Sequence, residues 1–255
     1  MRPRPRLALI LLVLAAAGGS AARASTPAEL FARANGAYEE GKYEEAATAY
    51  ATILDYGVID PRVLYNLGNA YFKMARLGPA ILNYERALRI DPADQDARDN
   101  LEFARGRIRD RVPEPEVPYP VQVLQDALDA LSSNLVSVIF LAAYLVASGL
   151  AGALPLVRSD LRRRVIAYTL AAAGMALALA GGALAYKVRD DASGRAIVMQ
   201  DRVDVLSGPA ADNTVLFTVH EGTRLQIRNR LDGWCQVSLP NALSGWVQAT
   251  SVEQV

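Results

Sequence analysis

Hydrophobic and polar positions divide the chain into regions with three different periodicities. Up to about residue 109, apolar and small residues recur at helical spacing with charged residues between them, which predicts a series of amphipathic helices. Two long runs without any charged residue follow, at 135–157 and 165–186. From residue 195 the pattern changes to short alternating stretches separated by turn residues, which is typical of a small all-β barrel or sandwich.

The helical region repeats itself with a period of 34 residues. Moving the sequence by this distance places Ala80 on Ala46 and Tyr84 on Tyr50. In repeats of this length, small residues let the two helices of a hairpin approach, and large residues fill the space beside them. The stretch at 95–109 is predicted to be a capping helix that covers the open face of the last repeat. Its apolar stripe is Ala97, Leu101, Ala104 and Ile108.

The period and residue types resemble those of the tetratricopeptide repeat. The downstream copy fills the family's signature positions with Leu64, Leu67, Gly68, Tyr71, Ala80, Tyr84, Ala87 and Pro92. The upstream copy keeps Leu30, Ala34, Gly41, Tyr43, Ala46 and Tyr50. The resemblance implies an all-α tetratricopeptide-repeat domain with its capping helix over residues 25–111. Ala75 and Leu77 depart from the usual glycine and tyrosine of the hairpin turn, so the angle of this hairpin is left open.

The resemblance also implies a concave groove, lined by the first helix of each hairpin, that binds a protein or peptide. The matching groove positions are Phe31, Asn35, Tyr38, Tyr65, Asn69, Phe72 and Lys73. Asparagine can hydrogen-bond a peptide backbone, and aromatic rings offer flat apolar contact. Alternatively, the aromatic residues only pack against neighbouring helices. Phe31 and Asp96 stand where the family's carboxylate-binding lysines are expected, so we do not expect a grip on a terminal carboxylate.

The N-terminal residues 1–24 have the order of a secretory signal peptide. A basic start is followed by a long apolar run and by Ala22-Arg23-Ala24, a small-residue cleavage site. An uncleaved anchor is the alternative. Cys235 is the only cysteine, and we expect it to be a small buried apolar residue.

Two transmembrane helices are expected at 134–157 and 165–188, because each apolar run reaches the roughly 30 Å of a bilayer core. A soluble bundle with buried alanine-rich helices is the alternative. The connection at 158–164 is rich in arginine and is therefore expected to stay in the cytoplasm. Both flanking modules would then face outward, into the periplasm.

Small residues at Gly174, Ala178 and Gly182 on the second run lie opposite Ser148 and Gly152 on the first. This spacing is expected to let the two helices pack closely as a hairpin, with a homodimer seam as the alternative. Residues 112–133 combine a proline-rich linker with an amphipathic helix. That helix is expected to lie along the outer membrane boundary, in contact with lipid, or else to extend the first span.

The alternating segment at 195–255 resembles the bacterial SH3 domain. Four family marks occur in order, at Val205–Pro209, Glu221–Ile227, Asp232–Trp234 and Gly245–Val247. Members outside the cytoplasm are often associated with cell-wall or peptide binding. Trp234 and Trp246 are candidates for a ligand-binding face, and the alternative is that both anchor the core of the barrel.

Neither the charge nor the motifs indicate catalysis. The chain carries 27 basic and 27 acidic residues, which gives no reason to expect a nucleic-acid partner. It has one histidine, His220, in a predicted turn, and no metal-binding, nucleophile or phosphate-loop motif. We therefore expect no catalytic residues, metal site or cofactor.

The whole arrangement is that of a multidomain membrane protein: a repeat domain, a two-helix transmembrane hairpin and a small all-β SH3-like barrel. This order resembles BatE-type proteins of the Bacteroides aerotolerance operon, which accompany a MoxR-type ATPase and von Willebrand factor A proteins. The resemblance implies a non-catalytic scaffold in the bacterial inner membrane that gathers envelope proteins. The alternatives are a peptidoglycan-binding cell-wall sensor and an accessory subunit of an envelope enzyme.

Overall fold

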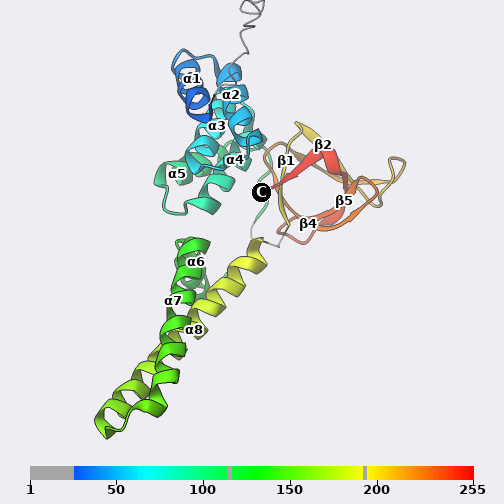
Figure 1. Cartoon of the computed structure of the whole chain (residues 1–255). Helices are drawn as coiled ribbons and strands as arrows, with labels where there is room; N and C mark the ends of the chain where they lie inside the picture. Colours follow the sequence, from blue (N-terminus) through cyan, green and yellow to red (C-terminus); the bar gives the residue numbers. More distant parts are fainter. Residues whose placement is uncertain (1–25, 114–116, 192–193) are drawn as a thin grey trace, which may run out of the picture.

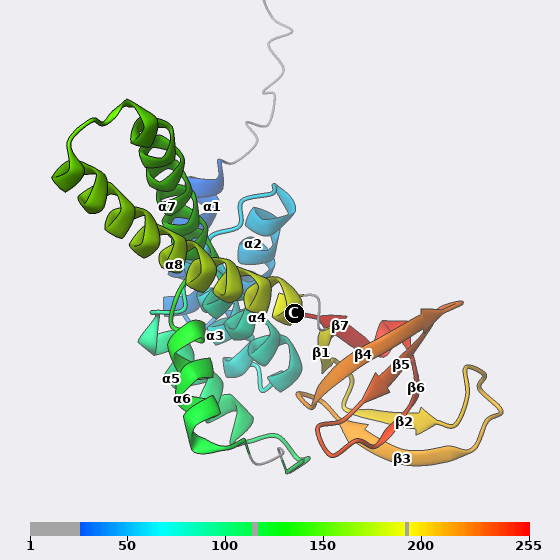
Figure 2. The same cartoon turned by 90° about the horizontal axis from the view of Figure 1, so that it is seen from below.

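The computed structural model describes residues 26–113, 117–191 and 194–255. A helical domain and a β-domain contact each other, and a helical hairpin projects away from both (Figures 1 and 2). The expected signal peptide, and part of the expected proline-rich linker, lie outside the described residues. The predicted combination of helical repeats, two apolar helices and a C-terminal antiparallel sheet is confirmed.

Five helices form the repeat domain. They are α1 (Pro27–Glu39), α2 (Tyr43–Asp55), α3 (Pro61–Lys73), α4 (Leu77–Ile90) and α5 (Gln95–Arg105). Their starts follow the local sequence: the Thr26 side chain caps α1 in a capping box with Glu29, and Asp60 caps α3. Proline at the first helical position of α1 and α3 has no N–H to leave unpaired.

The core of the repeats is built from small residues and two buried tyrosines. Tyr50 and Tyr84 are each 1% exposed. A Cβ added to Gly68 would lie 2.7 Å from the Tyr84 ring, so only glycine lets α3 and α4 come this close. The expected capping helix exists as α5, but it ends at Arg105 rather than at residue 109. Ala97, Leu101 and Ala104 of its predicted stripe are buried. Ile108 lies beyond the helix and contacts Gly222 of the β-domain.

Helices α7 (Ser133–Ala153) and α8 (Asp160–Asp191) form the apolar hairpin, with a short 3-10 helix, η1 (Leu154–Leu156), at the end of α7. Both are long and apolar enough to cross a membrane. Only 6% and 11% of their most apolar windows are buried, so the rest of the described chain does not cover them as it would the core helices of a soluble bundle. The predicted seven-residue loop is wrong in extent, because α8 already begins at Asp160 and includes three of the arginines.

The predicted contact between the small-residue stripe and the first span is also wrong. Gly174, Gly182 and Gly152 have open space around them. The face of α8 turned toward α7 instead contains Ala173, Ala180 and Gly181, and a Cβ on Gly181 would lie 3.5 Å from the Phe140 ring. The spacing of small residues is correct for a close approach, but the larger side chains that accompany them decide which face is covered.

Helix α6 (Tyr119–Asp129) precedes the hairpin and is separate from α7, since Ser132 caps a new helix start. None of its residues is buried by the described chain. The sequence predicts an apolar stripe of Val121, Leu124, Leu128 and Leu131 on this segment, and in the structure Val121 and Leu124 are exposed while Leu128 and Leu131 are half-buried.

The C-terminal domain is a sheet of seven strands in the order β3-β2-β6-β5-β4-β1-β7. The strands are β1 (Arg195–Val198), β2 (Arg202–Leu206), β3 (Val215–His220), β4 (Arg224–Leu231), β5 (Trp234–Ser238), β6 (Ser244–Gln248) and β7 (Val252–Gln254). Asp232 and Gly233 have φ values of 43° and 82° and join β4 to β5, as the Asp-Gly pair predicts. The alternating pattern misses two strands, β1 and β7, which lie nearest the repeats (Figure 2).

Candidate functional site

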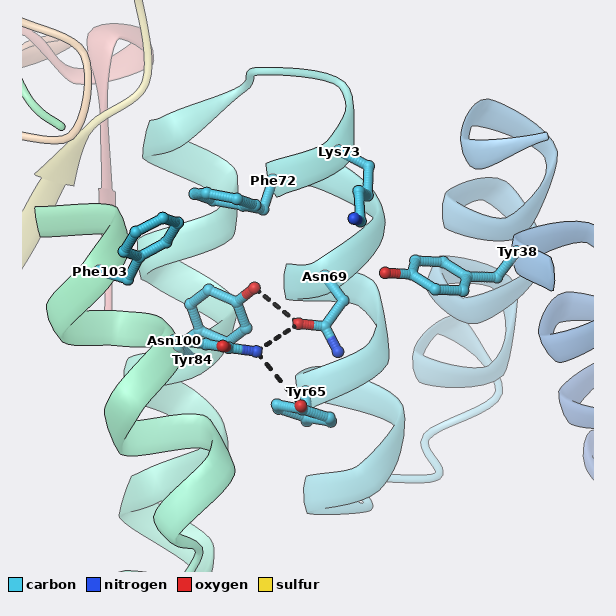
Figure 3. Close-up of a pocket in the computed structure, with 8 residues that line it drawn as sticks. All are labelled: Tyr38, Tyr65, Asn69, Phe72, Lys73, Tyr84, Asn100 and Phe103. Atoms are coloured by element: carbon cyan, nitrogen blue, oxygen red, sulfur yellow. Dashed lines mark hydrogen bonds between the residues drawn. The ribbon is translucent and has the colours of Figure 1, made fainter. Parts of the chain in front are cut away.

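The concave side of the repeats contains a cavity of about 330 Å³. Helices α1, α3, α4 and α5 contribute to it, because successive hairpins stack with their first helices toward the same side (Figure 3). Its lining is Tyr38, Tyr65, Asn69, Phe72, Lys73, Tyr84, Asn100 and Phe103. Five of these eight residues are groove positions expected from the sequence.

A hydrogen-bond network holds the polar floor of this cavity. Asn69 Oδ1 accepts from the Tyr84 hydroxyl at 2.7 Å and from Asn100 Nδ2 at 2.9 Å. Asn100 Nδ2 also lies 3.2 Å from the Tyr65 hydroxyl (Figure 3). These bonds fix the orientation of the Asn69 amide. Within the described ranges, the structure assigns no hydrogen bond to Asn69 Nδ2, so this N–H donor can meet a peptide carbonyl.

The other wall combines aromatic rings with positive charge. Phe72 and Phe103 lie 5.6 Å apart between ring centroids, and the Arg107 guanidinium lies 5.3 Å and 4.2 Å from their centroids. Phe103 is 54% exposed, although large apolar side chains usually avoid water. Lys73 adds an ammonium group at the same end of the cavity (Figure 3). This wall has the chemistry to bind an apolar side chain next to an acidic group.

Burial controls the ionisation of the groove tyrosines. It raises the pKa of Tyr38, with smaller contributions from Tyr43 and Tyr65, and it raises the pKa of Tyr84 more strongly. Both hydroxyls are therefore neutral at physiological pH and can donate hydrogen bonds. Neither of these two hydroxyls is available as an ionised base.

Two expected groove residues do not line the cavity. Phe31 packs against the repeat core, edge-on to Tyr50 with ring centroids 5.9 Å apart. Asn35 Oδ1 accepts hydrogen bonds from the Tyr50 hydroxyl at 2.6 Å and from Asn66 Nδ2 at 3.4 Å. For Phe31 the structure favours the packing alternative. Asn35 makes the same contacts as Asn69 one repeat earlier, but outside this cavity.

Three cavity residues come from parts of the chain that sequence reasoning did not assign to the groove. Tyr84 belongs to the second helix of its hairpin, and Asn100 and Phe103 belong to α5. A further shift by 34 residues would have found α5, because it places Leu101 on Leu67 and Asn100 on Asn66. Helix α5 is therefore the first helix of an incomplete third unit.

Both tryptophans of the β-domain lie outside its buried core cluster. On β5 and β6 the buried residues Cys235, Val237 and Val247 alternate with them, which turns the tryptophans to the opposite, outward face. Trp246 pairs with Gln236 across the two strands, and Trp234 pairs with Gln248. They form a partly exposed aromatic and amide surface. Cys235 is 1% exposed, so its expected burial is confirmed.

His220 has a structural partner. It ends β3, and its Nδ1 atom lies 2.7 Å from Asp110 Oδ1. Asp110 also accepts hydrogen bonds from the His220 backbone and from the Thr223 hydroxyl. Burial alone would raise the pKa of Asp110, but these hydrogen bonds outweigh it and hold the pKa below its usual value. The described residues contain no group of three or more potential metal ligands.

Comparison with known families agrees with this architecture. Residues 61–94 match the tetratricopeptide repeat, and residues 201–253 match the bacterial SH3 domain. The matched repeat covers α3 and α4, while α1 and α2 form the same hairpin upstream without a match of their own. No curated protein matches the chain at a significant level. The chain thus joins two kinds of non-catalytic interaction domain, suited to binding proteins or cell wall, to two helices that are able to span a membrane.

Proposed function

We propose that this chain is a membrane scaffold that holds a peptide segment of a partner protein in the concave cavity of its repeats. The observation that carries the proposal is the wall formed by the exposed Phe103 and Lys73 and the half-buried Phe72, beside the Asn69 donor. Exposed aromatic residues next to oriented polar groups are the usual basis of peptide recognition. The bound segment would be extended, with an apolar side chain next to an acidic one.

The scaffold is proposed to sit in the bacterial inner membrane with both terminal modules in the periplasm. Arg158 and the arginines at 162–164 lie together at the closed end of the α7–α8 hairpin, and such clusters are retained in the cytoplasm. The contact between α4 and β1 supports the same topology, because two modules that touch must lie on one side of the bilayer. Cysteine labelling of intact spheroplasts tests it. Tyr56→Cys and Leu243→Cys, each in a Cys235→Ala chain, should both react with an impermeant reagent, and reaction of only one would refute the topology.

As partners we propose the MoxR-type ATPase and von Willebrand factor A proteins that the resemblance to BatE-type proteins implies. Co-purification of the tagged full chain with such proteins encoded beside its gene tests this proposal. Phe103→Ala should abolish capture, whereas Tyr56→Ala, which removes an exposed aromatic outside the cavity, should not. Equal capture by both variants would argue against the groove. Capture of an enzyme instead would favour the accessory-subunit alternative.

A second candidate function is peptidoglycan binding by the β-domain. It is favoured by the outward position of Trp234 and Trp246 between the amide side chains of Gln236 and Gln248. Aromatic faces with amides beside them suit the apolar faces and hydroxyls of sugars. Sedimentation of the detergent-solubilised chain with purified sacculi tests it. Trp246→Ala should remove saturable binding, whereas Leu243→Ala, in the turn between β5 and β6, should retain it, and absence of binding by the wild type would exclude this candidate.

A further inference from the structure

The β-domain is packed against the outer side of α4, away from the concave cavity (Figure 1). Ile197 of β1 is 0% exposed, and the apolar cluster that buries it belongs to the repeats. Its neighbours there include Ile81 and Leu82 of α4 and Leu101 of α5. An apolar side chain of one module is therefore part of the core of the other.

The backbones of the two modules approach at two glycines, one from each side. A Cβ on Gly78 would lie 2.6 Å from the Val198 carbonyl oxygen and 2.9 Å from Glu221 Cγ. A Cβ on Gly222 would lie 2.6 Å from Ile108 Cγ2 and 3.1 Å from Ile81 Cδ1. Contacts this short leave no room for any other residue, which is the mark of an interface fitted at atomic detail.

The interface also supplies polar groups that the repeats lack. Helix α4 begins at Leu77 without a side-chain cap of its own, since Arg76 makes none. The Glu221 side chain of the β-domain lies against this helix start, with its Oε1 atom 3.3 Å from the position of a Cβ on Gly78. A helix start leaves its first N–H groups unpaired, and a carboxylate beside them complements the helix dipole. The β-domain thus places a carboxylate at the N-terminus of α4.

Two arginines extend the contact between the modules along α4. Arg86 donates to Glu253 Oε1 at 2.9 Å and to the Gln254 carbonyl at 2.7 Å. Arg89 donates to the Val255 carbonyl at 2.5 Å. Asp110, which follows the repeats, bonds to His220 and Thr223 on the β-domain. The contact therefore runs from the first turn of α4 to its last.

We propose that the repeats and the SH3-like module form a single cooperative folding unit into which the membrane hairpin is inserted. Two hairpins and α5 make a short array, and short arrays need their outer faces covered to be stable. The SH3-like module covers one such face by contributing Ile197 and the Glu221 side chain. It follows that the part of the module around Ile197 is unavailable to a ligand.

Hydrogen exchange of the full chain in detergent micelles tests the proposal through Gly78→Ala. In an isolated helix this change would stabilise α4, because alanine has the higher helix propensity. If the two modules form a single unit, the substitution should open the interface. Hydrogen exchange of the backbone amides at the start of α4 and in β1 should then become faster together, by roughly tenfold or more. Gly36→Ala in α1, where a Cβ has open space, is the matched control and should slow exchange or leave it unchanged.

Glu221→Ala removes the side chain at the α4 start without introducing the steric clash that Gly78→Ala creates. It should speed exchange of the α4 start, although the changed residue lies in the β-domain. If Gly78→Ala or Glu221→Ala perturbs only the module that carries the substitution, or if the wild-type modules unfold in two separate transitions, the proposal is wrong. Far-ultraviolet circular dichroism of each variant would confirm that both modules remain folded under the exchange conditions.

Discussion

The Tyr84 hydroxyl donates a 2.7 Å hydrogen bond to Asn69, and the same bond joins Tyr50 to Asn35 at 2.6 Å, 34 residues earlier. Each asparagine oxygen also accepts from an asparagine of the following unit, at 2.9 Å and 3.4 Å. The repeat is therefore a repeat of polar contacts as well as of apolar packing. Both tyrosine rings are buried, and burial raises the pKa of Tyr50 to about 12. These neutral hydroxyls are positioned to link the two helices of each hairpin.

Tyr84→Phe is expected to lower the free energy of unfolding by about 1 kcal/mol, because it removes one partly buried hydrogen bond and leaves the ring in place. Tyr50→Phe should have a similar effect at the equivalent position. Urea denaturation of the full chain in detergent, followed by circular dichroism, measures both. A loss in one variant without a loss in the other would show that the two hairpins are not equivalent.

The 34-residue period could be predicted from the sequence because tight packing requires a small residue at the same position in each copy. Gly68 corresponds to Ala34, and Ala80 corresponds to Ala46. The face of α8 that packs against α7 could not be predicted in this way. Gly174 and Gly181 are both glycines in the same apolar helix, and only the position of Phe140 shows which of them faces α7. The interface between the two modules could not be predicted from the sequence either. Ile197 is one apolar residue in a short strand, and its partners Ile81 and Leu82 are more than a hundred positions earlier in the chain.

Within the groove, the sequence identified the residues of α3 and missed those of α5. Tyr65, Asn69, Phe72 and Lys73 follow from the family positions and line the cavity. Phe103 lies in the segment that the sequence predicts to be a capping helix, outside the apolar stripe of that helix. Its exposed position beside Arg107 depends on how α5 stacks on α4, which is a tertiary relationship.

Lys73→Glu is expected to weaken binding of an acidic partner peptide about tenfold at low salt, because it replaces attraction by repulsion at one end of the cavity. The effect should shrink as ionic strength rises. Fluorescence anisotropy with labelled acidic and neutral peptides measures it. Lys42→Glu, an exposed lysine that does not line the cavity, serves as the control. Unchanged affinity for the acidic peptide would show that the charge of Lys73 does not contribute to recognition.

Gly181→Leu is expected to separate α7 from α8, since even a Cβ at this position would already contact the Phe140 ring at 3.5 Å. Gly174→Leu places the same side chain on the open face of α8 and should leave the hairpin intact. Fluorescence energy transfer between labels on α7 and α8, in nanodiscs, distinguishes the two variants. A larger loss of transfer in Gly174→Leu would mean that the packed face has been assigned incorrectly.

The contact between modules is expected to weaken in acid through Asp110. Its pKa lies below the usual 3.8, so the unfolded form binds a proton more readily than the folded one. The stabilisation is therefore present above this pH and is lost as the pH falls through the folded pKa. His220 is its direct hydrogen-bonding neighbour. Asp110 also lines a cavity of about 240 Å³ between the repeats and the β-domain, together with Arg111 and Arg224. Asp110→Asn should lower stability at neutral pH and flatten the acid limb of the stability profile below about pH 4.

The titration of Glu221 makes stability depend on pH in the opposite direction from that of Asp110. It therefore provides a check on the sign of the Asp110 effect. Burial raises the pKa of Glu221, and the N–H groups of Leu77 and Gly78 only partly offset this effect. Its contribution is greatest in acid, below its unfolded pKa, and is lost as the pH rises through the folded pKa. From about pH 4.5 up to the folded pKa, stability should therefore fall less with rising pH in Glu221→Gln than in the wild type. An acid limb that persists unchanged in Asp110→Asn would assign the dependence to other carboxylates.

Ala75→Gly is expected to stabilise the chain by about 1 kcal/mol. Ala75 closes the α3–α4 turn with φ of 59°, a left-handed conformation that a Cβ disfavours. The equivalent turn between α1 and α2 has Gly41 there, with φ of 77°. The hairpin keeps its geometry despite the departure from glycine, and it bears the strain locally.

The reciprocal change, Gly41→Ala, should destabilise the chain by a similar amount, because a Cβ there meets no atom within 4 Å and only backbone strain is added. Thermal unfolding of the two variants measures both effects. Shifts of the same sign would show that packing, and not the backbone conformation, controls these turns.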